Sequence, residues 1–523
     1  MTVANWNFGD LLDATAAAVP GDRPALIQGS RTICWSEFDA RTNSLARGML
    51  ARGLNYGDRV AILARNVPEY VEIAAAAFKA RLASVNVNYR YTTAEIDYVL
   101  QDSGARALFY QPEFADVVAP LGAPLTLAVQ IDGSDYGALV GGDPAPLRIA
   151  RSPEDGYLLY TGGTTGRPKG VIWRSGDARA IQLESPTVRR RVETMDDHVR
   201  AVRDNPSPGR VLPACPLMHG AGLNSSLAEL VNGGTVLLLP SERFDADELW
   251  REAARHRATR LLIVGDVFAR PMARSLLANP GRWDLSALRL ISSAGLMWSE
   301  EVKAALIAAL PHLTLMDILG ASEASGLGYA ITTATNSTPT GWFAASPTTV
   351  LIDPETDRIL ADEEPGEGLL ARCPPFAQGY HGDPAKTAAT FREIDGVTYA
   401  IPGDLAARDG GGRLRLIGRG NMCINTGGEK VFPEEVEEAL KLQPGVDDAM
   451  VLGIPDPQWG KAVVALIDTA GGYDEAAVRA GLKATLAAYK IPKHIVVVDA
   501  VPRHASGKGD YRAGAALAAE HLG

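Results

Sequence analysis

The chain has 523 residues, of which 46% are hydrophobic and 22% are charged, so it is long enough to form two or more globular domains. Its net charge of −11 excludes a general attraction to nucleic acid or to an anionic membrane surface. The four cysteines are scattered with no CxxC pair, which argues against a zinc site or a disulfide framework and predicts a cytoplasmic protein. We expect no signal peptide and no transmembrane span, because the N-terminus lacks a basic start and the apolar runs are short.

Strand-like runs alternate with helical runs along most of the chain. The apolar runs at 59–65, 233–240 and 260–265 each precede a run rich in Ala, Leu and Glu, at 68–80, 245–256 and 267–278 respectively. This alternation predicts a layered α/β fold with mostly parallel sheets. The polar stretch 174–210 carries charges of both signs and predicts a solvated helical excursion; a lid or an interface is the alternative.

A second boundary is predicted near residue 420, in a turn-rich stretch. After it, the pattern predicts a helix at 433–443, strands at 446–454 and 462–468, a helix at 474–489 and a strand at 494–499. We therefore expect an N-terminal domain over 1–420 and a separate small α+β domain over 421–523.

The stretch YTGGTTGRPKG, at residues 160–170, holds four glycines, three threonines and two basic side chains. Glycines let backbone N–H groups surround an anion, threonine hydroxyls add donors, and Lys169 supplies a positive charge. These features predict a loop that binds polyphosphate. It is not the P-loop of NTPases, because Lys169 is followed by Gly170 instead of Ser or Thr.

Further motifs follow this stretch in a fixed order. They are PLMHGAG (216–222), SSAGLMWS (292–299), ILGASE (318–323), GEGLLARCPPFAQGYHGDPAKT (366–387), YAIPGD (399–404), LIGRGNMCINTGGEKVFPEEVE (416–437) and RHASGKGDYR (503–512). Together they resemble the motifs of the acyl-adenylate-forming superfamily, in its acyl-CoA synthetase branch. The resemblance covers almost the whole chain and implies a large N-terminal domain of layered α/β subdomains plus a small mobile C-terminal domain.

The resemblance implies a ligase with two half-reactions, using ATP, Mg²⁺ and coenzyme A. A carboxylate attacks the α-phosphate of ATP to give acyl-AMP and pyrophosphate, and a thiol then displaces AMP. The family pattern assigns Lys508, Glu323 and Thr165 to catalysis, with Glu323 and Thr165 also holding Mg²⁺, which prefers oxygen ligands. The nucleotide-binding residues carried over from the family are Thr161, Gly162, Gly163, Thr164, Thr165, Lys169, Gly295, Leu296, Asp317, Ile318, Leu319, Gly320, Ser322, Glu323, Asp404, Arg419 and Lys508. Leu319 replaces the usual Tyr, so the surface over adenine is expected to be aliphatic.

The C-terminal motifs imply that the small domain rotates between the half-reactions. Gly427 and Gly428 would let the pantetheine arm of coenzyme A pass beside the backbone, and Lys430 would meet its anionic end. Asn421 occupies the hinge position, where relatives commonly have Asp or Lys, and Asn can also adopt unusual backbone angles.

The acid is expected to lack an ammonium group, because no Asp lies within residues 216–222, near which amino-acid-activating relatives place one. The residues expected in the acyl pocket are Met218, His219, Asn224, Gly265, Asp266, Phe268, Gly295, Leu296 and Gly326. Several are small, which predicts a roomy pocket. His219 is either a pocket wall or gate, or a satisfied core histidine.

Similarity to bacterial synthetases for steroid side-chain and terpenoid acids favours a bulky hydrophobic acid. The alternatives are a medium- or long-chain fatty acid, an enzyme that loads a carrier protein, or a degenerate member that binds ligand without turnover. The expected partners are the acid, ATP and coenzyme A, with no nucleic acid and no integral membrane association; a homodimer is compatible with the sequence.

Overall fold

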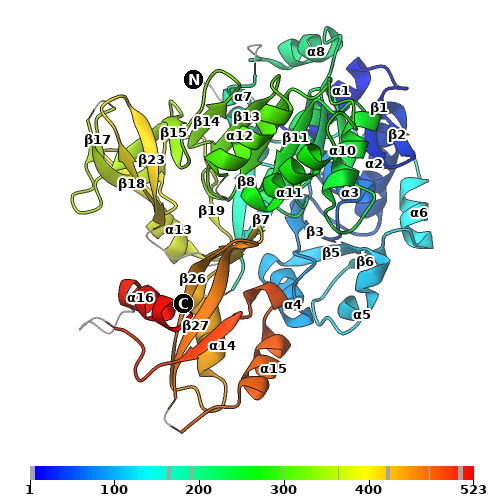
Figure 1. Ribbon diagram of the computed structural model, residues 1–523. Coiled ribbons are helices and arrows are strands. Elements are labelled where there is room, and N and C mark those ends of the chain that lie inside the picture. The colour runs from blue at the N-terminus through cyan, green and yellow to red at the C-terminus, as the bar shows by residue number, and fades with distance from the viewer. Residues whose placement is uncertain are drawn as a thin grey trace. The chain divides into compact units, whose positions relative to one another are not determined.

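The computed structural model describes residues 6–161, 167–188, 192–296, 298–362, 364–419, 424–469, 471–503 and 510–522 (Figure 1). The chain divides into a larger unit, made of Met1–Tyr89, Leu100–Leu159 and Gly170–Gly418, and a smaller unit, made of Arg90–Val99, Tyr160–Lys169 and Arg419–Gly523. The predicted domain boundary at 420/421 lies outside the described residues and stays a prediction.

The larger unit contains a 16-stranded sheet with a parallel half and an antiparallel half. Its strands run in the order β17 (Ile359–Leu360), β16 (Thr349–Ile352), β18 (Gly366–Arg372), β22 (Asp404–Arg408), β23 (Arg413–Arg419), β15 (Trp342–Ala345), β14 (Gly328–Thr332), β13 (Thr314–Leu319), β12 (Leu290–Ala294), β11 (Arg260–Ile263), β9 (Arg210–Pro213), β10 (Thr235–Leu238), β1 (Pro24–Gln28) and β2 (Arg31–Cys34), with β20 (Phe391–Ile394) and β21 (Val397–Ala400) off this path. Strands β1 and β9 to β13 pair in parallel, whereas the pairs from β13 through β14 and β15 to β23, and from β16 to β22, are antiparallel.

A second sheet has seven strands, in the order β19 (Gly379–Tyr380), β8 (Lys169–Arg174), β7 (Gly156–Thr161), β4 (Ala83–Asn86), β3 (Arg59–Leu63), β5 (Ala105–Tyr110) and β6 (Leu127–Gln130). Its core is built with α1 (Phe8–Ala18), α2 (Trp35–Ala51) and α3 (Pro68–Lys79). Every residue of α3 is buried, because four consecutive alanines let the helix pack closely on all sides.

Helices α10 (Ala246–Arg255), α11 (Gly265–Ala278) and α12 (Glu300–Ala309) pack on the parallel half of the first sheet (Figure 1). Trp250 and Trp298 are almost fully buried in the core that these helices share with β11, β12 and β13. The predicted strand–helix pairs over 59–80, 233–256 and 260–278 are thus confirmed as β3–α3, β10–α10 and β11–α11. The predicted α/β class is confirmed. The sequence predicted mostly parallel sheets, and the antiparallel half of the first sheet is the main feature that it did not predict.

The expectation of a solvated helix within 174–210 is wrong for α7 (Ser175–Glu184), of which six residues are buried. Asp177 accepts hydrogen bonds from Arg174 Nε at 2.6 Å and from Gln378 Nε2 at 2.9 Å. Arg179 is 1% exposed and donates to Gln182 at 3.2 Å. Asp177 is therefore satisfied partly by a distant segment, whereas Nε and Nη2 of Arg179 are buried with no hydrogen-bond partner among the described residues. Composition alone reveals neither feature. The other helices of the larger unit are α5 (Ala115–Val118), α6 (Ser134–Val140), α8 (Met195–Arg203), α9 (Gly220–Val231) and α13 (Pro384–Thr390).

The smaller unit has a three-stranded sheet of β26 (Asp448–Asp456), β27 (Gly460–Asp468) and β28 (His494–Val497). Helices α14 (Pro433–Lys441) and α15 (Glu475–Thr485) bury one set of side chains against it, and α16 (Tyr511–Leu522) buries another. The hairpin of β24 (Ile424–Thr426) and β25 (Glu429–Val431) precedes α14, and α4 (Thr93–Ser103) begins in this unit. The five elements predicted for 433–499 are confirmed.

Among the described residues, no helix combines the length and apolar character that crossing a membrane requires.

Candidate active site

Four parallel strands of the larger unit end at one edge of the first sheet. Strand β9 pairs with β11, β11 with β12, and β12 with β13, all in parallel register. Their carboxyl ends therefore meet at the same edge, which is where open α/β sheets bind ligands. The motif residues that follow these ends are Met218 and His219 after β9, Gly265 and Asp266 after β11, Gly295 and Leu296 after β12, and Gly320, Ser322 and Glu323 after β13.

Three glycines predicted in the acyl pocket have positive φ angles. The values are 54° at Gly265, 91° at Gly295 and 69° at Gly326. Side-chain-bearing residues rarely adopt this region, so the backbone itself requires glycine at these turns. The small side-chain volume of glycine is therefore not the only reason why glycine occupies these three positions.

An apolar wall forms from β11 and from the segments that follow β9, β11 and β12. Cys215, Leu262 and Val264 are buried in one cluster, against which the partly buried Ala221, Phe268 and Leu296 pack. Phe268 also packs edge-on against Phe244 at 4.8 Å between ring centroids. This cluster brings together two predicted wall residues, Phe268 and Leu296.

The polar candidates around this wall already have partners. Asp266 accepts from the backbone N–H of Ser299 at 2.9 Å and pairs with Arg270 at 3.0 Å, so it links the start of α11 to the N-cap of α12. Asn224 accepts from the Tyr157 hydroxyl at 2.9 Å, which links α9 to β7. His219 is the partly buried N-cap residue of α9, and Met218 is buried.

The loop carrying Glu323 is held by the second sheet. Trp173 in β8 donates its indole N–H to the carbonyl of Ser322 at 2.8 Å. The hydroxyl of Tyr380 in β19 donates to the Glu323 carboxylate, and the N–H of Ala377 donates to the Glu323 carbonyl at 3.2 Å. The carboxylate predicted to hold Mg²⁺ is thus oriented by an aromatic hydroxyl and fixed at its backbone.

Asp317 in β13 forms an ion pair with Lys303 of α12 at 3.1 Å. Lys303 is 2% exposed and also donates to the Thr338 carbonyl at 3.3 Å. Burial raises the pKa of Asp317 to about 6; the Lys303 ammonium opposes this shift and the Asp266 carboxylate adds to it. Ile318 and Leu319 complete β13 beside Asp317.

The remaining nucleotide candidates fall in several places. Thr161 ends β7, Lys169 begins β8, Asp404 is a buried residue that begins β22, and Arg419 ends β23. The residues Gly162, Gly163, Thr164, Thr165, Asn421 and Lys508 lie outside the described residues, so their roles stay predictions.

The coenzyme A candidates form the tip of the β24–β25 hairpin in the smaller unit. Gly427 and Gly428 have φ angles of 56° and 87°, and the N–H of Gly427 donates to the Trp459 carbonyl at 2.9 Å. A Cβ on Gly427 would lie 2.7 Å from the Trp459 ring, so the backbone and the indole are in close approach. Lys430 lies in β25, opposite Asn425.

Sequence reasoning missed Trp173, Lys303 and Tyr380, which orient predicted site residues. Tyr380 stands within the quoted motif at 366–387, and its position there was the available signal. Lys303 had none, because its pairing with Asp317 depends on how α12 packs against β13.

Comparison with known proteins identifies two matching family models. Residues 12–381 match the AMP-binding enzyme family, and residues 435–508 match the AMP-binding enzyme C-terminal domain. The chain is 36% identical to a 3-oxocholest-4-en-26-oate–CoA ligase of Rhodococcus rhodochrous, over 97% of this chain and 95% of that protein. It is 37% identical to the medium-chain acyl-CoA ligase Mig of Mycobacterium avium, over 95% and 96% of the two chains. The crystal structure of ATP-bound MatB from Rhodopseudomonas palustris superposes with a TM-score of 0.67 at 26% identity, over 98% of this chain and 99% of that one.

The contribution of the Asp317–Lys303 ion pair to stability should depend on pH. Replacing Lys303 with Met leaves the buried carboxylate without its cation, which typically costs about 3–5 kcal/mol. A raised pKa in the folded state means that the stability contribution of Asp317 is full below about pH 4 and is lost as pH rises through about 6. Losing Lys303 raises this pKa further, so Lys303→Met should lower the melting temperature more at pH 8 than at pH 5.

Thermal unfolding of wild type, Lys303→Met and Lys303→Met/Asp317→Asn at both pH values checks this expectation. The double variant removes the charge and should recover most of the loss seen at pH 8. An equal loss at both pH values would show that the pair contributes through packing alone.

Proposed function

Because the chain belongs to the AMP-binding enzyme family, as an AMP-forming acid–CoA ligase, we propose that it activates a bulky hydrophobic acid of the steroid or terpenoid class. The observation that carries this proposal is the full-length similarity to the Rhodococcus ligase for 3-oxocholest-4-en-26-oate. The apolar wall of Ala221, Phe268 and Leu296 is consistent with an acid that has a hydrophobic body.

The first half-reaction joins two anions, so positioning and charge neutralisation dominate its catalysis. The acid's carboxylate oxygen forms a bond to the α-phosphorus of ATP, and the bond from that phosphorus to the bridging oxygen breaks to release pyrophosphate. We assign the glycine-rich loop to the phosphates, Asp404 to the ribose hydroxyls and Lys508 to the charge that develops between carboxylate and phosphate. Asp317 would accept from the adenine amino group while Lys303 holds it in place.

The oxygen chemistry at Glu323 fits a divalent cation. Its carboxylate is oriented by Tyr380 and its carbonyl accepts from Ala377, just before β19, so it can present an oxygen ligand without rearranging. Glu323 and Thr165 would hold Mg²⁺, whose charge would neutralise the phosphates when it is bound.

The second half-reaction transfers the acyl group to coenzyme A. Its thiol sulfur forms a bond to the acyl carbon, AMP leaves, and the thiol proton is released to solvent. Gly427, Gly428 and Lys430 are assigned to the pantetheine arm and its anionic end, and Asn421 to the hinge of the rotating domain. A carrier-protein acceptor remains the alternative for this step.

A medium- or long-chain fatty acid is the second candidate substrate. The 37% identity to the medium-chain ligase Mig favours it, since that similarity is as extensive as the one to the steroid acid ligase. The two acids differ mainly in width, so the apolar wall is the place to distinguish them.

Lys508 and Lys430 should separate the two half-reactions. Lys508→Ala should lower the rate of pyrophosphate release by about 10²–10³-fold, the usual effect of one lost charge-stabilising contact, yet spare thioester formation from supplied acyl-AMP. Lys430→Ala should show the reverse pattern. Pyrophosphate release and acyl-CoA formation are measured separately for both variants. Equal damage to both halves in both variants, with the fold intact, would refute the assignment.

Glu323 should set the requirement for Mg²⁺. Glu323→Gln keeps an acceptor for Tyr380 but removes the charge, so the Mg²⁺ concentration that gives half-maximal activity should rise. The measurement is a Mg²⁺ titration at saturating ATP, with Glu355→Gln, at an exposed residue outside the site, as control. If the titration curve stays where it is in wild type, Glu323 does not hold the metal.

Ala221 tests the width of the acyl pocket without backbone strain, since it lies inside α9. Ala221→Leu should lower kcat/KM for a polycyclic acid by about ten- to a hundredfold, because overpacking typically costs about 1–3 kcal/mol. A short straight-chain acid should be affected little, and Ala221→Ser serves as the control of similar volume. If wild type prefers straight-chain acids, the fatty-acid candidate replaces the steroid one.

A further inference from the structure

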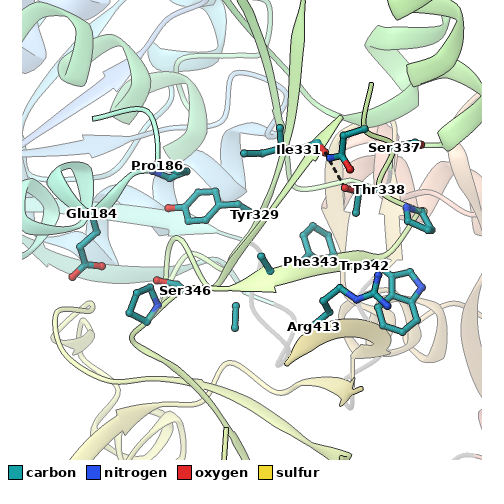
Figure 2. Close-up of a pocket in the computed structure, with 15 residues that line it drawn as sticks. Glu184, Pro186, Tyr329, Ile331, Ser337, Thr338, Trp342, Phe343, Ser346 and Arg413 are labelled. Carbon is teal, nitrogen blue, oxygen red and sulfur yellow. Dashed lines mark hydrogen bonds between the residues drawn. The ribbon is translucent and has the colours of Figure 1, made fainter. Parts of the chain in front are cut away.

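A cavity of about 480 Å³ lies in the larger unit, beside strands β14 and β15 (Figure 2). Its walls come from the end of α7, from β14 and the loop after it, and from β15 and the start of β23. Its volume falls in the range of pockets that bind small molecules, and aromatic and aliphatic side chains supply much of its lining.

The charged residues of this cavity are already neutralised. Glu184 pairs with Arg372, which is fully buried and also donates to the carbonyls of Gly326 and Pro375 at 2.9 and 2.8 Å. Arg413 pairs with Asp409 at 2.8 Å and lies over the Trp342 ring at 4.9 Å from its centroid. The cavity therefore carries no unpaired charge among these residues that a charged ligand would have to neutralise.

The hydroxyl of Tyr329 is different, because within the described part of the chain it makes no hydrogen bond. Figure 2 shows its ring directed across the cavity, with the hydroxyl on the side of Glu184 and Pro186. Burial raises the pKa of this hydroxyl above its ordinary value, so at neutral pH it is a protonated donor. A half-buried donor that faces a cavity can select a ligand with an acceptor, since an unmade hydrogen bond is costly.

Tyr329 also connects the cavity to the predicted acyl pocket. A Cβ on Gly326 would lie 2.8 Å from the Tyr329 hydroxyl and 3.7 Å from Arg372. The same tyrosine therefore touches the turn at Gly326, three residues after Glu323, and lines the cavity. An acid whose carboxylate lies near Glu323 and which passes Gly326 would next meet Tyr329.

We propose that this cavity receives the end of the acid remote from its carboxyl group, and that the Tyr329 hydroxyl donates a hydrogen bond to a neutral oxygen, oxo or hydroxyl, carried there. The inference rests on the proposed function and adds a selecting residue to it. The substrate class is then a broad apolar acid with an oxygen at its far end. Hydrophobic lining takes up the body, and one donor recognises the oxygen.

The test compares two acids that differ in that oxygen, 3-oxocholest-4-en-26-oic acid and cholest-4-en-26-oic acid, with hexanoic acid as a short reference. Pyrophosphate release gives kcat/KM for each acid with wild type and Tyr329→Phe. The variant should lose about two- to tenfold with the oxo acid, the effect of one neutral hydrogen bond, and should be unchanged with the other two. Tyr56→Phe, at an exposed tyrosine outside the cavity, is the matched control.

A second variant tests the cavity itself. Ala344 is an exposed residue of β15 that lines the cavity, and strands accept aromatic residues well, so Ala344→Phe should fold. It should lower kcat/KM for both steroid acids about tenfold and leave hexanoic acid unchanged, whereas Ala344→Ser should affect neither.

The outcomes separate the inference from the proposed function. If wild type uses the steroid acids and Tyr329→Phe changes both alike, or Ala344→Phe changes neither, the inference is overturned and the proposed function stands. If wild type ignores both steroid acids but activates hexanoic acid, the proposed acid class fails and the inference fails with it.

Discussion

The parallel pairing of β9, β11, β12 and β13 is the constraint on which the candidate site depends. Parallel strands require crossover helices, so each strand's carboxyl end must open into a loop on the same edge of the sheet. The motifs between residues 216 and 323 are thereby brought to the same edge of the sheet. The chain then needs only short turns to present them, and glycines with positive φ at Gly265 and Gly295 supply those turns.

The predicted site residues at this edge are held in place by residues to which the sequence analysis assigned no role. Trp173 and Tyr380 belong to the second sheet but hold the loop of Ser322 and Glu323 on the first. Lys303 fixes Asp317 from the neighbouring helix. In each of these contacts, a buried or half-buried polar group holds a predicted site residue in one orientation. This favours catalysis, because groups that are already positioned need not reorganise during the reaction.

The sequence predicted local structure well where periodicity is strong, as in β3–α3, β11–α11 and the five elements over 433–499. It failed at α7, where the charged composition indicated exposure to solvent, because Asp177 has a partner in Gln378, far along the chain, in addition to the nearby Arg174. The sequence also could not show that Gly265, Gly295 and Gly326 have positive φ angles; that these glycines leave room for the acid stays a prediction. Long-range pairing and backbone conformation are both properties of the folded chain, and neither leaves a periodic signal.

In the proposed assignment, the site has a nucleotide end at the strand ends and an acyl end around β14 and β15, and the two differ in their polar groups. Near the strand ends, the carboxylates of Glu323 and Asp317 are held by Tyr380 and Lys303, which would suit the nucleotide that we propose to bind there. Around β14 and β15 the charged side chains neutralise one another, in the pairs Glu184–Arg372 and Asp409–Arg413. The hydroxyl of Tyr329 is the polar group that faces the cavity. A single neutral donor discriminates weakly compared with a buried charge, so relatives could change their acid by altering a few such residues while the nucleotide end stays fixed. Substrate preference in this fold would then be set mainly by the walls beyond Gly326 and not by the adenylating machinery.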